Sequence, residues 1–273
     1  MSFTKATLFA ATCLFASHAM AESGIAEVVS AEEIEWGYLN PLRGEASPGA
    51  ADLWGDRTKD GATGMLVRFN AGFSSPPHIH NITYKGIVIK GLMHNDDPDA
   101  AEMWLPTGSF WTQPAGEDHI TAAKGEANLI YLEIDSGPYL VQPSTQAFDN
   151  GERPLNLHRS NMVWLDNIDS HRLTAAGVQS TFLWGSTDIG QLNGSLVTLP
   201  AGFQGQVVSS ASEFRAIVIE GSIVYSSAKV DGDKNLTAGS YFSSDGEFNH
   251  TLAVPDSSEV TLYIRTNDKY EIK

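Results

Sequence analysis

Three histidines have a spacing that could bring their side chains to one point. His78 and His80 are two residues apart, so on a β-strand both imidazoles project from the same face. His119 stands at the end of a later segment that reads as a strand followed by a turn. Three neutral imidazoles that converge inside a barrel form a metal site with open positions. The alternative is that these are ordinary strand histidines with local hydrogen bonds.

This ligand set indicates one divalent transition metal but does not select it. Three imidazoles suit Fe(II), Zn(II), Ni(II), Mn(II) or Cu(II). Folding outside the cytosol would favour Zn or Cu over Fe and Mn, because those ions bind nitrogen ligands more tightly.

The residues around the three histidines resemble the two sequence motifs of the cupin family. The matching positions of the first motif are Gly72, His78, His80 and Gly91, and those of the second are Gly108, Pro114, Gly116 and His119. The resemblance implies jelly-roll β-barrels with the metal held by the three histidines. It also implies dioxygenase-like chemistry, since cupins similar to this one are often Fe(II) dioxygenases.

One departure from the family pattern concerns Tyr84. The glutamate that usually completes the cupin ligand set falls on this tyrosine. A neutral phenol, with an ordinary pKa near ~10, is a poor metal ligand. Tyr84 is therefore a candidate catalytic residue that contacts bound water or substrate, a phenolate ligand, or a core aromatic. Loss of the carboxylate makes the metal centre more positive, which favours an anionic substrate.

Three further residues are candidates for the same site. His94 follows the first motif and could face the barrel interior as a catalytic base or a fourth imidazole; the alternative is a surface histidine at a strand end. Gln113 and Glu133 could reach the cavity and contact the substrate or the ligands. The alternative for Glu133 is an outward-facing charge on its strand.

The chain repeats itself, which predicts two similar domains. Leu53-Trp54-Gly55 recurs as Leu183-Trp184-Gly185, and Ile87-Val88-Ile89 recurs as Ile217-Val218-Ile219. Both copies consist of short runs rich in Val, Ile, Phe and Tyr bounded by turn residues, the pattern of an all-β sandwich or barrel. We expect two tandem cupin-type jelly-roll barrels, a bicupin, with domains at 22–145 and 146–273 and a linker within 142–156.

The second copy lacks most of the proposed ligands. In register, His78 corresponds to Val208, His80 to Ser210, Tyr84 to Phe214 and His119 to His250. A lone histidine does not hold a metal, so we predict one metal site, in the first barrel. The second barrel would serve packing or dimerisation, and because bicupins often pair, a homodimer is a further expectation.

The N-terminus has the pattern of a secretory signal. Lys5 precedes an apolar stretch, and Ala19-Met20-Ala21 forms a small-x-small cleavage site. Cleavage after residue 21 predicts a secreted or periplasmic protein. Cys13, the one cysteine in the chain, would be removed with the signal, which excludes a disulfide and thiolate chemistry.

Charge limits the partners. The formal net charge is −16 at pH 7, and so negative a surface repels nucleic acid and anionic membranes. We expect a small-molecule ligand instead. The preferred function is a metal-dependent, dioxygenase-like enzyme acting on a small anionic organic substrate. The alternatives are a metal-assisted hydrolase or isomerase, and a non-catalytic periplasmic protein that binds or senses a small molecule or metal.

Overall fold

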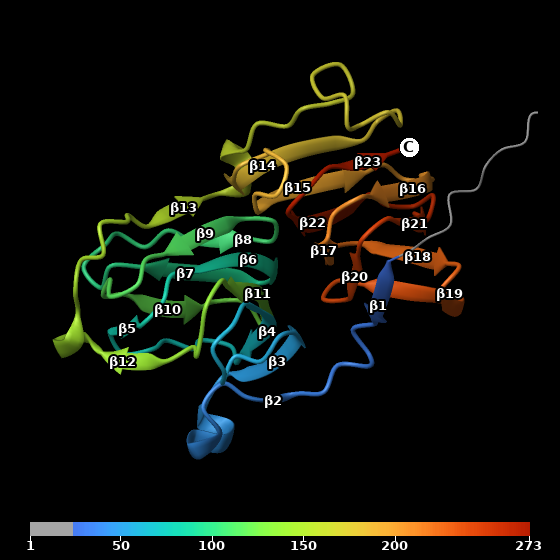
Figure 1. The fold of residues 1–273 in the computed structure, drawn as a ribbon. Coiled ribbons are helices and arrows are strands. Elements are labelled where there is room, and N and C mark those ends of the chain that lie inside the picture. Colours follow the sequence, from blue (N-terminus) through green and yellow to red (C-terminus); the bar gives the residue numbers. More distant parts are fainter. Residues whose placement is uncertain (1–23) are drawn as a thin grey trace, which may run out of the picture.

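The computed structural model describes residues 24–273 as an all-β protein of two halves (Figure 1). The all-β prediction is confirmed, whereas the predicted signal at 1–21 lies outside the described residues. Within 24–273 the helices are short 3-10 turns: η1 (Pro41–Ala46), η2 (Ser144–Gln146) and η3 (Arg159–Asn161). In this part of the chain, none of the helices has the length and apolar character needed to cross a membrane.

The first half consists of one large sheet and two small ones. The large sheet has the order β13-β9-β6-β11-β4-β3-β2, and the small sheets are β10-β7-β8 and β12-β5. The bounds in the large sheet are β2 (Gly37–Tyr38), β3 (Gly49–Trp54), β4 (Thr63–Phe69), β6 (Tyr84–Lys90), β9 (Phe110–Gln113), β11 (Asn128–Ile134) and β13 (Leu155–Leu157). Those in the small sheets are β5 (His78–His80), β7 (Leu92–Asp96), β8 (Leu105–Pro106), β10 (Ile120–Ala123) and β12 (Val141–Pro143).

The second half repeats this plan with a six-stranded and a five-stranded sheet. Their orders are β1-β20-β17-β22-β15-β14 and β19-β18-β21-β16-β23. The first contains β1 (Ile25–Val29), β14 (Gln179–Gly185), β15 (Asn193–Leu199), β17 (Phe214–Glu220), β20 (Tyr241–Asp245) and β22 (Val260–Thr266). The second contains β16 (Gln204–Ser209), β18 (Ser222–Ser227), β19 (Val230–Thr237), β21 (Phe248–Ala253) and β23 (Tyr270–Ile272).

Two strands cross between the halves. β1, at the start of the described chain, pairs with β20 of the second half, where Figure 1 shows it in blue among orange strands. β13, which follows the expected boundary at residue 145, pairs with β9 of the first half. Each covers a sheet edge that would otherwise expose unpaired backbone groups. The two halves are therefore joined by exchanged strands as well as by the linker.

The large sheets of the two halves pack face to face. Side chains alternate along each strand, so on β6 Ile87 and Ile89 point to the other half while Tyr84 and Val88 point into their own barrel. The apolar residues of this interface include Leu53, Leu66, Ile87, Ile89 and Phe110 from the first half and Leu196, Ile217, Ile219 and Tyr241 from the second.

A buried ion pair lies within this interface. Glu133 and Arg265 are each 1% exposed, and Arg265 Nη1 donates to Glu133 Oε1 at 3.3 Å. Tyr131 and Tyr263 also donate to the Glu133 carboxylate, at 3.0 and 2.9 Å. The structure therefore corrects the expectation that Glu133 reaches the cavity: it lies on the opposite face of β11 and joins the two halves.

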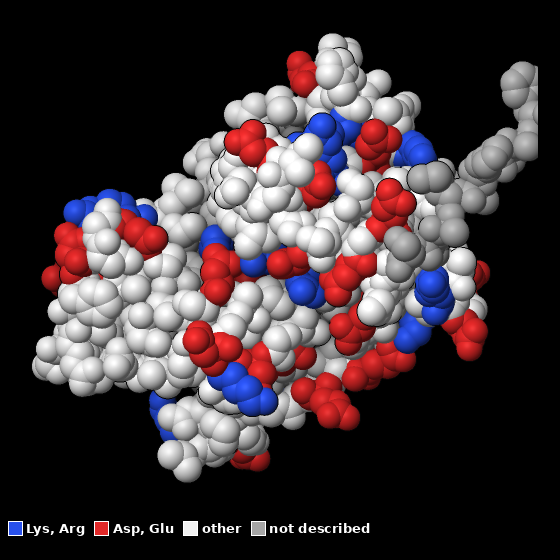
Figure 2. Space-filling model, in the orientation of Figure 1, with Lys and Arg blue, Asp and Glu red and all other residues white. Residues whose placement is uncertain are grey.

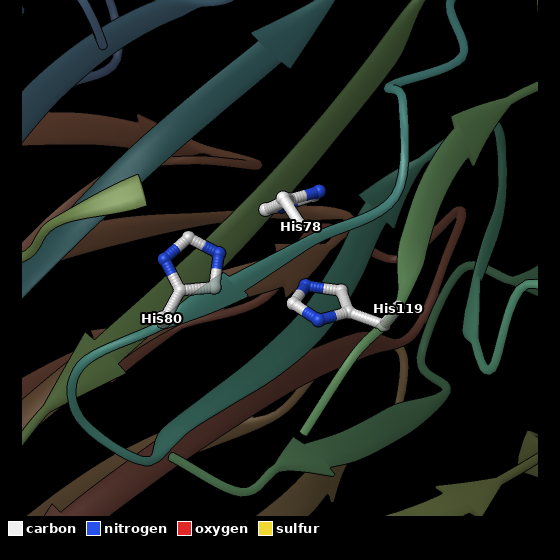
Figure 3. Close-up of side chains that lie close together, drawn as sticks. All are labelled: His78, His80 and His119. Atoms are coloured by element: carbon white, nitrogen blue, oxygen red, sulfur yellow. The ribbon is translucent and has the colours of Figure 1, made fainter. Parts of the chain in front are cut away.

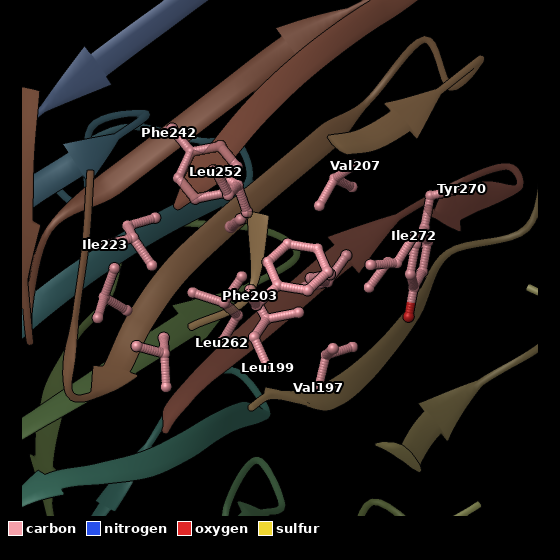
Figure 4. Packing of buried hydrophobic residues seen from close by; sticks show 14 of the residues in the cluster. Val197, Leu199, Phe203, Val207, Ile223, Phe242, Leu252, Leu262, Tyr270 and Ile272 are labelled. Carbon is pink, nitrogen blue, oxygen red and sulfur yellow. The ribbon is translucent and has the colours of Figure 1, made fainter. Parts of the chain in front are cut away.

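The interior of the second half is filled with apolar side chains (Figure 4), including Val197, Leu199, Phe242, Leu262 and Ile272. His250 lies among them, stacked on Phe214 with ring centroids 5.0 Å apart. Its Nδ1 meets the Tyr225 hydroxyl at 2.9 Å, and its Nε2 meets the Ser244 hydroxyl at 3.1 Å. Both ring nitrogens are thus occupied. Burial lowers the pKa of His250 to about 3.

Replacing Arg265 by Met should destabilise the protein by roughly 3–5 kcal/mol, because Glu133 would remain buried without a cationic partner. The free energy of unfolding measured by chemical denaturation checks this value. Arg153→Met is the control, because the Arg153–Asp149 pair is exposed and its loss should cost less than about 1 kcal/mol. Equal effects of the two substitutions would contradict the assigned role of the buried pair.

His250 should make stability depend on pH. Because the pKa of His250 is depressed in the folded protein, this side chain binds a proton below about pH 6.5 in the unfolded chain but stays neutral in the folded one. Stability is then lost as pH falls toward 4, at up to ~1.4 kcal/mol per pH unit for this one group. His250→Gln should reduce that slope when unfolding free energies at pH 4 to 6.5 are compared with the wild type. An unchanged slope would contradict the prediction.

Candidate metal centre

The structure brings His78, His80 and His119 together in the first half (Figure 3). His78 and His80 occupy the two ends of β5, and the backbones of His78 and His119 exchange two N–H···O bonds of 3.0 Å. This pairing places the three rings with centroids 4.3 to 5.2 Å apart. One possible ligand atom from each ring lies within 4.8 Å of the others, and all three residues are buried.

Backbone carbonyls orient all three rings in the same way. The partners of Nδ1 are the carbonyl oxygens of Pro76 for His78 (3.0 Å), Leu140 for His80 (2.9 Å) and Glu117 for His119 (3.0 Å). A carbonyl can only accept, so each Nδ1 carries the proton and each Nε2 keeps a lone pair. Metal-binding histidines have this arrangement, in which the outer hydrogen bond fixes the tautomer and ring orientation. The donor set therefore fits a divalent transition metal.

Burial keeps these rings neutral. It lowers the pKa of His119 to about 3, with the neighbouring His78 as a second cause. It also lowers the pKa of His78, and brings that of His80 well below its ordinary value with help from the two other imidazoles. At neutral pH the rings are in the form that metal binding requires.

Tyr84 lies beside the histidines. Its hydroxyl donates to Asn95 Oδ1 at 2.9 Å and lies 3.4 Å from His119 Nε2. Burial raises the pKa of Tyr84 well above its usual value, so the phenol is neutral. The side chain is placed where it can contact a bound water or substrate.

Gln113 acts through Asn95. It donates to the carbonyl oxygen of Glu117 at 3.3 Å and accepts from Asn95 Nδ2 at 2.8 Å. This orientation turns Asn95 Oδ1 toward Tyr84 and Thr121, whose hydroxyls both donate to it. Gln113 is 1% exposed and is not among the cavity-lining residues, so the structure places it behind Asn95 rather than in contact with a ligand.

The structure corrects the predicted role of His94. β7 alternates, with Met93 packed in the barrel core and Asn95 lining the cavity. His94 between them faces the other way, where Nδ1 meets the carbonyl oxygen of Met103 at 3.3 Å and the ring lies 5.9 Å from that of Trp104. It is buried outside the cavity, so the expectation of a fourth imidazole or a base there was wrong.

The sequence reasoning missed Asn95 and Tyr139. Asn95 could have been found, because a strand that directs Met93 inward must also direct the residue two positions on. Tyr139 stacks on His80 with centroids 4.4 Å apart, and its hydroxyl donates to His80 Nε2 at 3.1 Å. It comes from a loop that Asn81 fastens through bonds to Pro138 and Leu140, and no periodic pattern marks that loop.

A cavity of about 130 Å³ opens beside the histidines. Its walls are mainly apolar, with His78, His80, Tyr84, Asn95 and Tyr139 among its polar groups. Arg43, an exposed residue on η1, is the one charged side chain among the described lining residues. The cavity thus combines apolar walls with a cation near its opening, in a protein with 33 acidic residues against 17 Lys and Arg. Figure 2 shows acidic side chains over one face of both halves.

Comparisons with solved structures confirm two tandem cupin barrels. A Nostoc punctiforme protein provisionally named a dioxygenase matches with a TM-score of 0.63 and 16% identity, covering 89% of this chain and 82% of that one. Oxalate decarboxylase of Lactobacillus farciminis, in complex with formate, matches with a TM-score of 0.56 and 11% identity over 90% of this chain and 87% of that one. Vicilin of hazelnut, Corylus avellana, matches with a TM-score of 0.54 and 10% identity over the same shares.

At these identities the solved structures establish the fold alone. No curated protein matches the chain. A family model does match, over residues 27–273, and the chain belongs to that family, described as a domain of unknown function (DUF4437).

Proposed function

We propose that this protein holds one divalent transition metal at Nε2 of His78, His80 and His119, and is an enzyme acting on a small anionic organic substrate in the first barrel. The observation that carries the proposal is the set of three Nδ1–carbonyl bonds, which leave Nε2 of each ring without a proton in a cluster whose possible ligand atoms lie within 4.8 Å of one another. Ordinary strand histidines have no reason to share one tautomer in this way.

The reaction class that we propose is dioxygenase-like. The Nostoc punctiforme neighbour is provisionally named a dioxygenase, which supports the class by analogy of fold. When bound, a transition metal would supply Lewis-acid and redox chemistry. Tyr84 would exchange a proton at its oxygen, and the apolar walls would exclude water from the reacting atoms.

The cavity supports a small, anionic substrate. Arg43 supplies positive charge at its opening, and no Asp or Glu is among the described lining residues. The carboxylate that cupins usually contribute is replaced by neutral Tyr84, which leaves the metal centre more positive. The volume of about 130 Å³ is close to that of an apolar cavity of roughly 150 Å³ known to hold one benzene ring. The formate held by the oxalate decarboxylase neighbour is likewise a small carboxylate.

We further propose that the protein works after export, in the periplasm or outside the cell, as its N-terminal signal pattern and absence of cysteine beyond residue 13 indicate. Its strong negative charge favours a small-molecule partner over nucleic acid or anionic membrane.

The double variant His78→Ala/His119→Ala should lose bound metal, with affinity falling at least 100-fold, while the fold is retained because the barrel cores do not include the metal. Elemental analysis and circular dichroism check these two outcomes. His250→Ala is the control and should keep its metal, because both nitrogens of His250 are occupied by hydroxyls. Metal loss in the control would show that the site had been assigned to the wrong barrel.

Oxygen uptake tests the reaction class. Metal-loaded wild type is supplied with small carboxylic acids, with the double variant as background. Uptake that depends on both acid and metal supports the dioxygenase. Turnover that is equal with and without oxygen indicates a hydrolase or isomerase, and a tightly held molecule released unchanged on denaturation indicates a binding protein.

Arg43→Gln should weaken binding of benzoate about 10-fold while leaving metal content unchanged, since the loss of one charge-assisted hydrogen bond costs roughly 1.5 kcal/mol. Isothermal titration calorimetry on metal-loaded protein measures this affinity. Arg68→Gln is the matched control, because Arg68 stacks on Trp36 at 4.3 Å and is not among the cavity-lining residues. Equal affinities for all three proteins would rule out Arg43 as the anion-binding group.

A further inference from the structure

The hydroxyl of Tyr139 occupies a nitrogen atom that the proposed metal needs. The Leu140 carbonyl holds the proton of His80 on Nδ1, so Nε2 of this ring can only accept a hydrogen bond. The Tyr139 hydroxyl lies 3.1 Å from that Nε2 and therefore donates its proton to it. The phenol ring also stacks on the imidazole, with centroids 4.4 Å apart and ring planes at 24°. Two consecutive residues thus bond the two nitrogens of His80.

The segment that carries Tyr139 is fastened to the body of the first half. Asn81 donates to the carbonyl oxygen of Pro138 and accepts from the backbone N–H of Leu140, each at 2.9 Å. The backbone N–H of Tyr139 donates to the carbonyl oxygen of Arg57, also at 2.9 Å. Hydrogen bonds on three successive residues therefore hold the phenol in its place.

The Nε2 lone pair of His80 cannot serve a proton donor and a metal at the same time. A metal on this nitrogen breaks the bond from Tyr139 and leaves a phenol proton that needs another acceptor. Tyr84 is different, because its proton goes to Asn95 Oδ1, which the three-histidine site does not use. Of the two phenols beside the histidines, Tyr139 is thus the one whose proton must change its partner.

The new acceptor has to come from the cavity. Tyr139 lines the cavity together with His78, His80 and Tyr84. A ligand that enters the cavity therefore reaches the phenol and the histidine cluster at one place. An anionic atom there has lone pairs for both the metal and the phenol proton, and a hydrogen bond to a charged acceptor is stronger than one to a neutral acceptor.

We propose that, in the metal-loaded protein, the Tyr139 hydroxyl donates a hydrogen bond to the anionic ligand that binds the metal. Without metal, the same proton caps Nε2 of His80. This inference rests on the proposed function and deepens it, since it adds a recognition residue and favours substrates that approach the metal through a negatively charged oxygen atom, such as a carboxylate or an enolate.

The second half contains a matched tyrosine. Tyr270 packs edge-on to Phe214 with centroids 6.2 Å apart, and Tyr139 packs in the same way on the counterpart ring of the first half, at 6.0 Å. The Tyr270 hydroxyl bonds to Ser195 Oγ at 2.9 Å. In register, the first half has Met65 where the second has Ser195, so this hydroxyl partner is missing. The ring therefore packs alike in both halves, whereas the partner of the hydroxyl differs.

Azide binding to cobalt(II)-loaded protein, followed in the visible spectrum of the metal, tests the inference. Tyr139→Phe keeps the ring and removes the hydroxyl. It should weaken azide binding about 10-fold, as expected for a lost hydrogen bond to a charged group. Its cobalt affinity should not fall, because Nε2 of His80 no longer has to release a proton donor. Tyr270→Phe is the control and should keep the wild-type azide affinity, since its hydroxyl bonds to Ser195 in the second half.

Three results would overturn the proposal. The first is equal azide affinity, or no azide binding, in cobalt-loaded wild type and Tyr139→Phe. The second is an equal loss of azide affinity in Tyr270→Phe. The third is a fall in the cobalt affinity of Tyr139→Phe by about 10-fold or more, because the hydroxyl would then act as a metal ligand or support the histidine cluster itself. Failure of the proposed function is distinguishable, because wild type would then bind no cobalt before any azide is added.

Discussion

The site depends on three hydrogen bonds between imidazole Nδ1 atoms and backbone carbonyls. Each acceptor belongs to a loop or strand end next to the cavity: Pro76, Glu117 and Leu140. Because backbone carbonyls are held by the surrounding ladder, the rings need no other side chain to set their tautomer. The Leu140 carbonyl is itself positioned by Asn81, which bonds both sides of that loop. The orientation of the histidine cluster is thus set by main-chain groups rather than by the side chains that line the cavity.

The large sheet of the first half serves two purposes because its strands alternate. On β11, Ile130 and Leu132 face the cavity side, while Tyr131 and Glu133 face the second half. All residues of β11 except the half-buried Leu129 are buried, so burial does not tell the two faces apart. The same alternation on β7 turns Asn95 to the cavity and His94 away from it. The large sheet therefore lines the cavity with one face and forms the interface with the other, while the histidines stand on β5 and next to β10, opposite it.

The fold and the three histidines could be predicted because both leave local patterns. The repeat, the glycine-bounded apolar runs and the His-x-His spacing are all short-range features. Glu133 and His94 could not be placed in this way, since a charged or ionisable residue on a strand reads alike whether it faces a cavity or an interface. Glu133 is accommodated by Arg265, a partner 132 positions later that also accounts for its burial. The exchange of β1 and β13 was likewise invisible, because edge pairing depends on which edges remain open.

The interiors of the two halves differ in the surroundings of their polar groups. In the second, His250 has a hydroxyl on each nitrogen and is surrounded by Phe214, Phe242 and Phe248, so its polarity is fully satisfied. In the first, His78, His80, Tyr84 and Asn95 line a cavity, and Nε2 of His80 accepts from the Tyr139 hydroxyl. The polar groups of the first half therefore lie at a cavity, whereas those of the second half are enclosed in a filled apolar core.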